Sequence, residues 1–318
     1  MPEIPLQRLR TGFYCQAMRP LRSLAVYLLV ILVGGALLAP WLYLAAQAAA
    51  KNFSSLQKLA QSPFHRFVHR SMLILAVAGL WPFLLSLNMR QPASLGLQNP
   101  FRHWSKLISG FLFGFVSLAC LALFIILAGA RKINFAHTGA EIVRDCFKSL
   151  GTAAIVAVLE EILFRGALLG ALRRARPWTY ALLISSAVYA LVHFFSQPQS
   201  PKEIDWSSGF VVLGQMLSGF TDWQRLLPGF FNLTLAGILL GLAFLRTGTL
   251  FCSIGIHAGW IFWLKFFSYV TAPVAGASAW WWGTEKLIDG WMALLILSLS
   301  LVGLRQVWPQ ETASNDAQ

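Results

Sequence analysis

The stretch GTAAIVAVLEEILFRGALLGALRR, residues 151–174, decides how the rest of the chain is interpreted. It is apolar enough to enter a lipid bilayer, yet Glu160, Glu161 and Arg165 stand near its middle. A charged side chain at the centre of a bilayer costs about 2.5–3.5 kcal/mol on insertion scales. We therefore expect these side chains to face a protein interior or a water-filled cavity, with the other segments forming the container around them.

The composition is that of an integral membrane protein. The chain has 318 residues, of which 57% are hydrophobic and 12% are charged, and its mean hydropathy is +0.63. Soluble domains are about 25% charged. Apolar runs of about 20 residues, the length that crosses a bilayer as a helix, recur along the sequence. This length favours helices over the alternating strands, about ten residues long, of an outer-membrane barrel.

Eight such runs predict an all-α, polytopic transmembrane helix bundle with a membrane-embedded polar cavity. The first run follows basic residues but lacks a small-residue cleavage site, and we expect it to be a retained helix. We expect a single membrane domain over 1–318 and a disordered tail over 309–318. The predicted spans are 24–46, 71–88, 107–130, 151–174, 178–195, 230–245, 250–269 and 287–307.

Two shorter segments are assigned by composition. The basic and amphipathic segment 51–70 is expected to lie along the membrane surface. The apolar patch 210–217 is too short to span a bilayer, which predicts a re-entrant or interfacial segment.

The formal net charge of +13 is compatible with nucleic-acid binding. However, Lys and Arg stand in short loops between apolar runs, as expected beside anionic headgroups. We therefore expect the lipid bilayer as a partner and no nucleic acid. The location is integral and multi-pass, in the cytoplasmic membrane if the source is bacterial. The four cysteines are scattered and form neither a disulfide framework nor a CxxC pair.

Three sites of ionisable residues inside the predicted spans stand out. Glu161 and Arg165 are four residues apart on a helix and share a face, so they can form an ion pair. Glu160 is rotated about 100° from Glu161 and points toward other spans. His193 and His257 belong to two of those spans. One reading is a buried ion network that only fixes helix packing; the other is a functional cluster, the usual role of ionisable groups inside membranes.

A glutamate with two histidines suits water activation. The carboxylate can take a proton from water, one imidazole can hold that water, and the second can stabilise an oxyanion, where a donor contributes about 3–4 kcal/mol. The same three side chains could instead bind zinc. The HExxH motif of zinc proteases is absent from the sequence.

Three segments resemble, in order, the motifs of the CPBP family of intramembrane proteases. This family includes the CAAX prenyl endopeptidases and Abi-type bacterial members. The resemblance implies a catalytic core over 145–270. The segments are EEILFRG (160–166), SSAVYALVHF (185–194) and AGILLGLAFLRTGTLFCSIGIHAGW (236–260).

The resemblance implies a role for each matching residue. Glu160 would activate the attacking water, and His193 would assist it. His193 ends a YxxxH version of the family's FxxxH motif, with Tyr189 in the place of Phe. Glu161 and Arg165 would hold the constellation in place.

His257 would belong to the oxyanion-binding motif, which in the family usually reads HxxxN. Ile261 stands where Asn is usual, and an apolar side chain cannot donate a hydrogen bond. Three explanations are open: Trp260 or another donor substitutes, the enzyme is slower, or proteolysis has been lost.

These residues and the resemblance predict an intramembrane endopeptidase. Its substrate would be a membrane-associated protein or peptide, either a prenylated CAAX-type peptide or a leader peptide. We expect glutamate-dependent hydrolysis without a cofactor or metal; zinc is the alternative. The alternative function, supported by Ile261, is a catalytically impaired membrane scaffold or immunity-type factor. A proton-coupled transporter is disfavoured because paired halves with interrupted helices are not evident.

Overall fold

The computed structural model describes residues 6–196, 198–284 and 286–309. It confirms the all-α membrane bundle, because helices lie at all eight predicted positions. Five helical segments are long and apolar enough to cross a membrane, and Trp178–Leu191 and Trp291–Val307 are shorter apolar helices. The predicted disordered tail, 309–318, lies outside the described residues except for Pro309.

The chain folds into two compact units. The first contains the residues up to Arg90 together with Phe194–Asp222, and the second contains Gln91–His193 and the chain from Trp223 onward. The predicted core 145–270 therefore has its middle part in the first unit and its two ends in the second.

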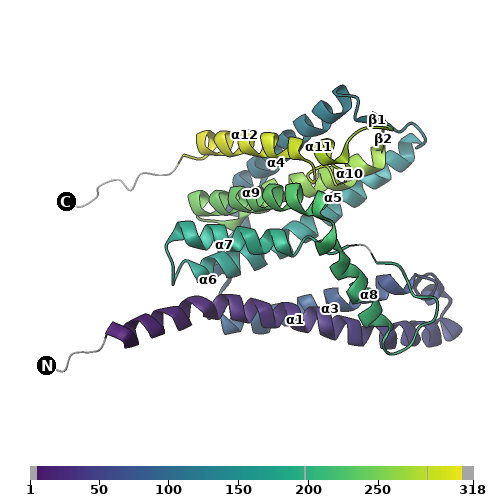
Figure 1. Cartoon of the computed structure of the whole chain (residues 1–318), viewed down its shortest axis with the longest axis horizontal. Helices are drawn as coiled ribbons and strands as arrows, with labels where there is room; N and C mark the ends of the chain where they lie inside the picture. The colour runs from purple at the N-terminus through teal and green to yellow at the C-terminus, as the bar shows by residue number, and fades with distance from the viewer. Residues whose placement is uncertain (1–5, 197, 285, 310–318) are drawn as a thin grey trace. The chain divides into compact units, whose positions relative to one another are not determined.

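The first unit is built on two long helices, α1 and α3, against which the shorter α8 packs. The hydroxyl of Tyr27 in α1 donates to the carbonyl oxygen of Ala76 in α3 at 2.7 Å. Its helical elements are α1 (Leu6–Asn52), η1 (Ser54–Leu56), α2 (Gln57–Ala60), α3 (Phe64–Ser86), α8 (Ser208–Leu217) and η4 (Ser218–Thr221) (Figure 1).

The expectation for segment 51–70 is wrong over its last third. Helix α3 begins at Phe64, directly after Pro63, so residues 64–70 belong to a long apolar helix. Phe64 and Phe67 are buried, and Phe64 packs in the hydrophobic core of the first unit. Phe64 and Phe67 are three residues apart, so they share one face of a helix, and their burial extends the helix toward its N-terminus. The short apolar patch 210–217 is part of helix α8.

The second unit contains the remaining elements. These are η2 (Pro92–Leu95), α4 (Pro100–Leu127), β1 (Arg131–Ile133), α5 (Gly139–Glu161), the π-helical segment η3 (Ile162–Leu169), α6 (Gly170–Leu172), α7 (Trp178–Leu191), α9 (Trp223–Thr247), α10 (Leu250–Val270), β2 (Thr271–Pro273), α11 (Ala279–Trp282) and α12 (Trp291–Val307). Strands β1 and β2 form one short antiparallel pair, with Lys132 opposite Ala272.

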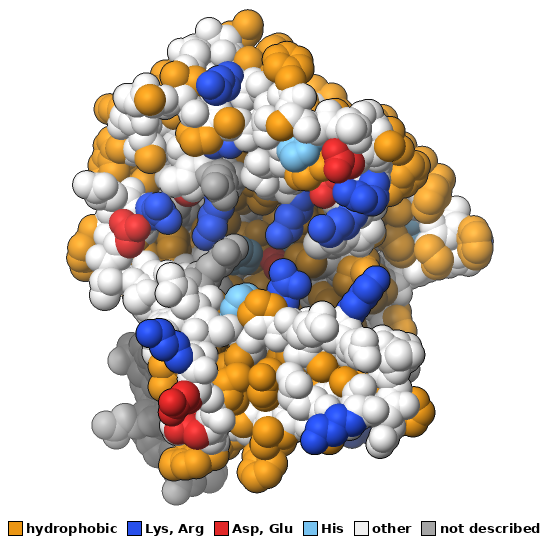
Figure 2. Space-filling view, turned by 90° about the vertical axis from the view of Figure 1, so that its right-hand side faces the viewer, with side chains coloured by type: hydrophobic (Ala, Val, Ile, Leu, Met, Phe, Trp, Pro, Cys, Tyr) orange, Lys and Arg blue, Asp and Glu red, His pale blue; other side chains and the backbone are white. Residues whose placement is uncertain are grey.

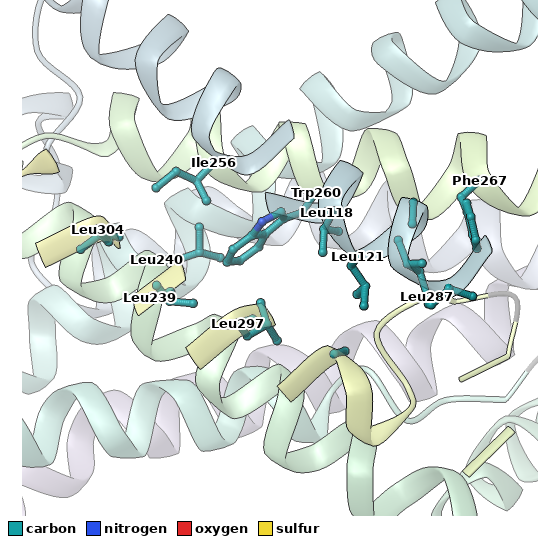
Figure 3. Close-up of a cluster of buried hydrophobic side chains, with 14 of the residues drawn as sticks. Leu118, Leu121, Leu239, Leu240, Ile256, Trp260, Phe267, Leu287, Leu297 and Leu304 are labelled. Carbon is teal, nitrogen blue, oxygen red and sulfur yellow. The ribbon is translucent and has the colours of Figure 1, made fainter. Parts of the chain in front are cut away.

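Helices α4, α9, α10 and α12 enclose the hydrophobic core of this unit (Figure 3). The core is rich in leucine, and one aromatic ring with a polar group, that of Trp260, lies within it. The indole N–H of Trp260 donates to the hydroxyl of Ser117 in α4 at 2.9 Å. This hydrogen bond satisfies the indole donor inside an apolar core.

The surface is as apolar as a lipid environment requires. Large hydrophobic side chains such as Leu112, Phe147 and Ile155 are more than half exposed. On the face shown in Figure 2, hydrophobic side chains lie in separate groups, with Lys and Arg and other side chains between them. The many large hydrophobic side chains left exposed agree with a membrane protein.

Helices α4 and α10 approach each other closely through two pairs of glycines, Gly110 with Gly114 and Gly255 with Gly259. A Cβ atom added at any of these four glycines would collide with backbone atoms of the facing helix. Glycines four residues apart allow such close contact between helices in membranes. His257 lies midway between the two α10 glycines in sequence, about 200° from either around the helix. Packing on α4 therefore turns His257 toward the opposite side of α10.

The contacts also fix the relative direction of the two helices. Gly110 faces Cys252 and Gly114 faces Ile256, so position increases together along both helices and they run parallel. The third and seventh of eight spans must run in the same direction across a membrane. The packing therefore agrees with the predicted order of spans.

Helix α5 begins twelve residues before the predicted fourth span. Its N-terminus carries a capping box, in which the Thr138 hydroxyl accepts from the Glu141 N–H and the Glu141 carboxylate accepts from the Thr138 N–H. This reciprocal pairing satisfies two backbone donors of the first turn. Residues 139–150, which precede the predicted fourth span, are therefore helical.

Replacing Gly114 by Ala should destabilise the protein, because the new methyl group would collide with the backbone of Ile256. We expect a loss of about 1–3 kcal/mol, typical of overpacking, measured as a lower unfolding temperature in detergent. The matched control is Gly151→Ala in α5, where no atom lies within 4 Å of the added Cβ. That change should leave stability equal or raise it by up to about 1 kcal/mol through helix propensity. Equal effects of the two substitutions would contradict the proposed close contact.

Candidate active site

The second unit brings together the ionisable residues that the sequence places in three separate spans. They come from the end of α5, the π-helical segment η3, helix α7 with the turn that follows it, and the middle of α10. The residues are Glu160, Glu161, Arg165, Tyr189, His193 and His257.

One half of this cluster is buried and centred on Glu161. Its Oε1 lies 2.6 Å from Nη1 of Arg165 and accepts from Nδ1 of His257 at 2.9 Å. The exposed fractions of the Glu161, Arg165 and His257 side chains are 0%, 3% and 5%. The predicted Glu161–Arg165 pair is therefore present, and it includes a third partner that the spacing alone did not reveal. A buried carboxylate is tolerated when it is paired and hydrogen-bonded in this way.

The other half is accessible and centred on Glu160. Its Oε2 lies 3.4 Å from Nε2 of His193 and 3.8 Å from Nε2 of His257. The side chains of Glu160 and His193 are 26% and 28% exposed. Both side chains are therefore partly open to the surroundings, although Glu160 Oε2 itself is buried, whereas the Glu161 side chain has no exposed surface.

Hydrogen bonds at Nδ1 determine which nitrogen each imidazole presents to Glu160. His193 Nδ1 lies 2.7 Å from the carbonyl oxygen of Tyr189, which can only accept, so this nitrogen carries a proton. His257 Nδ1 faces the Glu161 carboxylate and donates in the same way. Both rings consequently turn Nε2 toward Glu160. Partners that orient a histidine through its second nitrogen are a common device in active sites.

The charge of the cluster is almost balanced. Two carboxylates and one guanidinium give a formal charge of −1 when both imidazoles are neutral. Burial of net charge is costly, and one additional proton on Glu160, His193 or His257 would make the group neutral. The geometry therefore suits a cluster that holds one transferable proton.

Tyr189 is packed between the two halves of the cluster. The Arg165 guanidinium lies over its ring, 4.3 Å from the centroid, and the ring of Phe164 meets it edge-on at 5.2 Å. The ring of His193 lies 4.4 Å away. The hydroxyl of Tyr189 lies 3.3 Å from Nε2 of His257. The resemblance places Tyr189 where the family has Phe, and a comparison of the two side chains along the sequence does not reveal the contact of the hydroxyl.

Trp260 and Ile261 differ in what they offer the cluster. The structure does not support Trp260 as the substitute hydrogen-bond donor, because its N–H is donated to Ser117 of α4. Ile261 is buried in α10, one helical turn after His257 and on the same face. Its side chain supplies no donor there.

The π-helical segment η3 begins directly after Glu161 and contains Arg165. A π-helix has more residues per turn than an α-helix and is frequent at functional sites. It changes the faces of the residues that follow the two glutamates. The spacing of the sequence predicts an α-helix throughout, and no residue in ILFRGALL signals this change.

The buried charges, two oriented imidazoles and accessible carboxylate define a helical membrane protein with a candidate hydrolytic centre. Residues 143–263 match the family model described as Rce1-like, type II CAAX prenyl endopeptidase Rce1-like. This match includes all six cluster residues and confirms the resemblance of the chain to the CPBP family of intramembrane proteases. Comparisons with curated proteins and with solved structures gave no match.

A zinc centre would need three or four ligand side chains gathered around one point. Within the described ranges no group of three or more His, Cys, Asp or Glu side chains is arranged to hold a metal ion. The residues present therefore do not form a recognisable zinc site. The metal-free prediction stays a prediction.

Replacing Arg165 by Met should strongly destabilise the fold. The change leaves the buried Glu161 carboxylate without its cation, and breaking a buried pair from one side costs about 3–5 kcal/mol. The measurement is thermal or denaturant unfolding in detergent. The matched control is Arg144→Met on the exposed surface of α5, expected to change stability by less than about 0.5 kcal/mol. Similar stability of the two variants would contradict a structural role for the pair.

Proposed function

We propose that this chain is an intramembrane endopeptidase that hydrolyses a peptide bond in a membrane-associated peptide by means of water activated at Glu160. The observation that carries the proposal is the convergence of two imidazole Nε2 atoms on Glu160 Oε2, a buried oxygen without a hydrogen-bond partner on a side chain that is itself partly exposed. A carboxylate and an imidazole placed around a water form a general-base site. A buried ion network that only fixed packing would not need an accessible carboxylate.

The proposed reaction begins with a water molecule held by Glu160 and His193. Glu160 takes one proton of the water as its oxygen attacks the scissile carbonyl carbon, and the carbonyl oxygen becomes an oxyanion. The bond from carbon to the amide nitrogen then breaks as the proton on Glu160 passes to that nitrogen. The products are a carboxylic acid and an amine, so the atoms of one water are fully accounted for.

The sealed half of the cluster would act by positioning. Glu161 holds the imidazole of His257 through Nδ1, and Arg165 neutralises Glu161. These contacts keep the second Nε2 directed at Glu160 without a rearrangement during the reaction. Groups that are already oriented before the charge develops give the largest electrostatic benefit to catalysis.

The class of substrate follows from the location of the site and from the family match. A peptide in the bilayer has its carbonyl groups hydrogen-bonded within a helix, so the scissile segment has to be extended before water can attack. The match to the type II CAAX prenyl endopeptidase model supports a CAAX-type peptide whose prenyl chain lies in the membrane. A leader peptide of a membrane-bound precursor has the same requirement.

Glu160→Gln should abolish cleavage, because an amide cannot take the proton from water. We expect a loss of at least about 10³-fold, within the range that general bases contribute. The assay uses purified protein in liposomes with an internally quenched, farnesylated CAAX peptide. A parallel comparison of membrane peptides in cells with wild type and variant should reveal a fragment that only wild type produces.

The matched control for this test is Glu141→Gln, at the other end of α5. Glutamine can keep the capping contact of Glu141 with Thr138, so activity should stay at the wild-type level. If the Glu160→Gln variant cleaves as well as wild type, the water-activation mechanism is excluded. If wild type cleaves no peptide, and cells with the Glu160→Gln variant behave like cells with wild type, the scaffold or immunity-type function is supported instead.

A second prediction concerns metal dependence. Because the proposed mechanism uses only side chains and water, treatment with EDTA or 1,10-phenanthroline should leave the cleavage rate within about twofold of its untreated value. Loss of activity on chelation that zinc restores would show that the Glu160 cluster works as a metal centre.

A further inference from the structure

The proposed reaction places negative charge on the carbonyl oxygen, and this charge requires a hydrogen-bond donor. On α10 the position one turn after His257 is occupied by Ile261, which has no donor. The neighbouring Trp260 donates its N–H to Ser117. Apart from His257 itself, a further donor for the oxyanion must therefore come from another element.

Most donors of the cluster are already committed. Arg165 binds Glu161 at 2.6 Å and also approaches the carbonyl oxygen of Gly237 at 3.5 Å. His193 Nδ1 is donated to the Tyr189 carbonyl and His257 Nδ1 to Glu161. The groups left on the side of the cluster that faces Glu160 are the two Nε2 atoms and the hydroxyl of Tyr189.

The Tyr189 hydroxyl is placed where such a donor is needed. It lies 3.3 Å from His257 Nε2, and the same nitrogen lies 3.8 Å from Glu160 Oε2. One ring nitrogen thus separates the hydroxyl from the carboxylate that would activate water. The side chain of Tyr189 is 3% exposed, so its O–H group acts in a largely water-excluded setting, where electrostatic interactions are strong.

The ring that carries the hydroxyl is firmly held. The Arg165 guanidinium covers one part of it and Phe164 meets it edge-on. The hydroxyl hydrogen can nevertheless rotate about its C–O bond. Because Nδ1 of His257 carries a proton, a neutral His257 offers a lone pair at Nε2, and the Tyr189 hydroxyl donates to it before the substrate binds. The same O–H can turn to an oxyanion that forms nearby.

We propose that Tyr189 is a catalytic residue of this chain and that its hydroxyl donates a hydrogen bond to the oxyanion. Ile261, one turn after His257, has no group that could make this hydrogen bond. His257 supports this hydroxyl through Nε2 and is itself held by Glu161. The inference rests on the peptidase function proposed above. It also explains how the cluster can stabilise an oxyanion without an amide at position 261.

The test is Tyr189→Phe, which keeps the ring and its contacts and removes only the hydroxyl. With the quenched, farnesylated CAAX peptide in liposomes, kcat should fall by about 10²–10³, the usual effect of removing one oxyanion donor. KM should change less than about threefold, because the contact is made in the transition state and not with the bound substrate. The unfolding temperature should match that of wild type.

A matched control and a rescue variant make the result specific. Tyr180→Phe, an exposed tyrosine in the same helix α7, should leave kcat unchanged. The double variant Tyr189→Phe with Ile261→Asn places an amide donor one turn after His257, and it should regain at least about tenfold in kcat over Tyr189→Phe. A ring that served only packing would not be rescued by an amide on another helix.

The outcomes separate this inference from the function on which it rests. If wild type does not cleave the peptide or any membrane peptide in cells, the peptidase proposal fails and the role of Tyr189 fails with it. If wild type cleaves and Tyr189→Phe keeps kcat within threefold, the hydroxyl is not the donor and only this inference is overturned. The inference is overturned as well if kcat and the unfolding temperature fall together, or if the asparagine at position 261 restores nothing.

Discussion

The buried carboxylate of Glu161 is the constraint on which the site depends. A charge with no exposed surface must find its partners within the protein, and Glu161 finds them in Arg165 and His257. These partners come from the π-helical segment and from α10. One carboxylate therefore ties together two pieces of chain that are about ninety residues apart. This requirement also orients the imidazole of His257. Because its Nδ1 is held by Glu161, only Nε2 is left to face Glu160.

The site divides its ionisable groups by exposure. The two adjacent glutamates have the same chemistry, but the Glu161 side chain has no exposed surface and the Glu160 side chain is partly exposed. Their roughly 100° separation around the helix produces this difference. The sealed residue provides orientation and charge balance, and the accessible one is left for the reaction. Neighbouring identical side chains can thus serve different purposes without any difference in sequence context beyond their position on the helix.

Much of the fold was predictable because bilayer physics restricts the choice. Long apolar runs gave the helices, and the cost of charge in lipid required Glu160, His193 and His257 to meet. The four-residue spacing gave the Glu161–Arg165 pair. The early start of α5 was missed although Thr138 and Glu141 form a capping pattern, because the predicted span covers only the apolar run. The π-helical turn and the Tyr189 hydroxyl contact depend on tertiary packing, which spacing along one helix does not encode.

The glycine contact between α4 and α10 has a consequence for the path of a substrate. Where Gly114 faces Ile256, the two backbones leave no room even for a methyl group. An extended peptide is several ångströms wide, so it cannot pass between these helices. A chain travelling from the lipid to Glu160 has to enter beside some other helix, and α4 with α10 forms a closed wall behind the imidazole of His257.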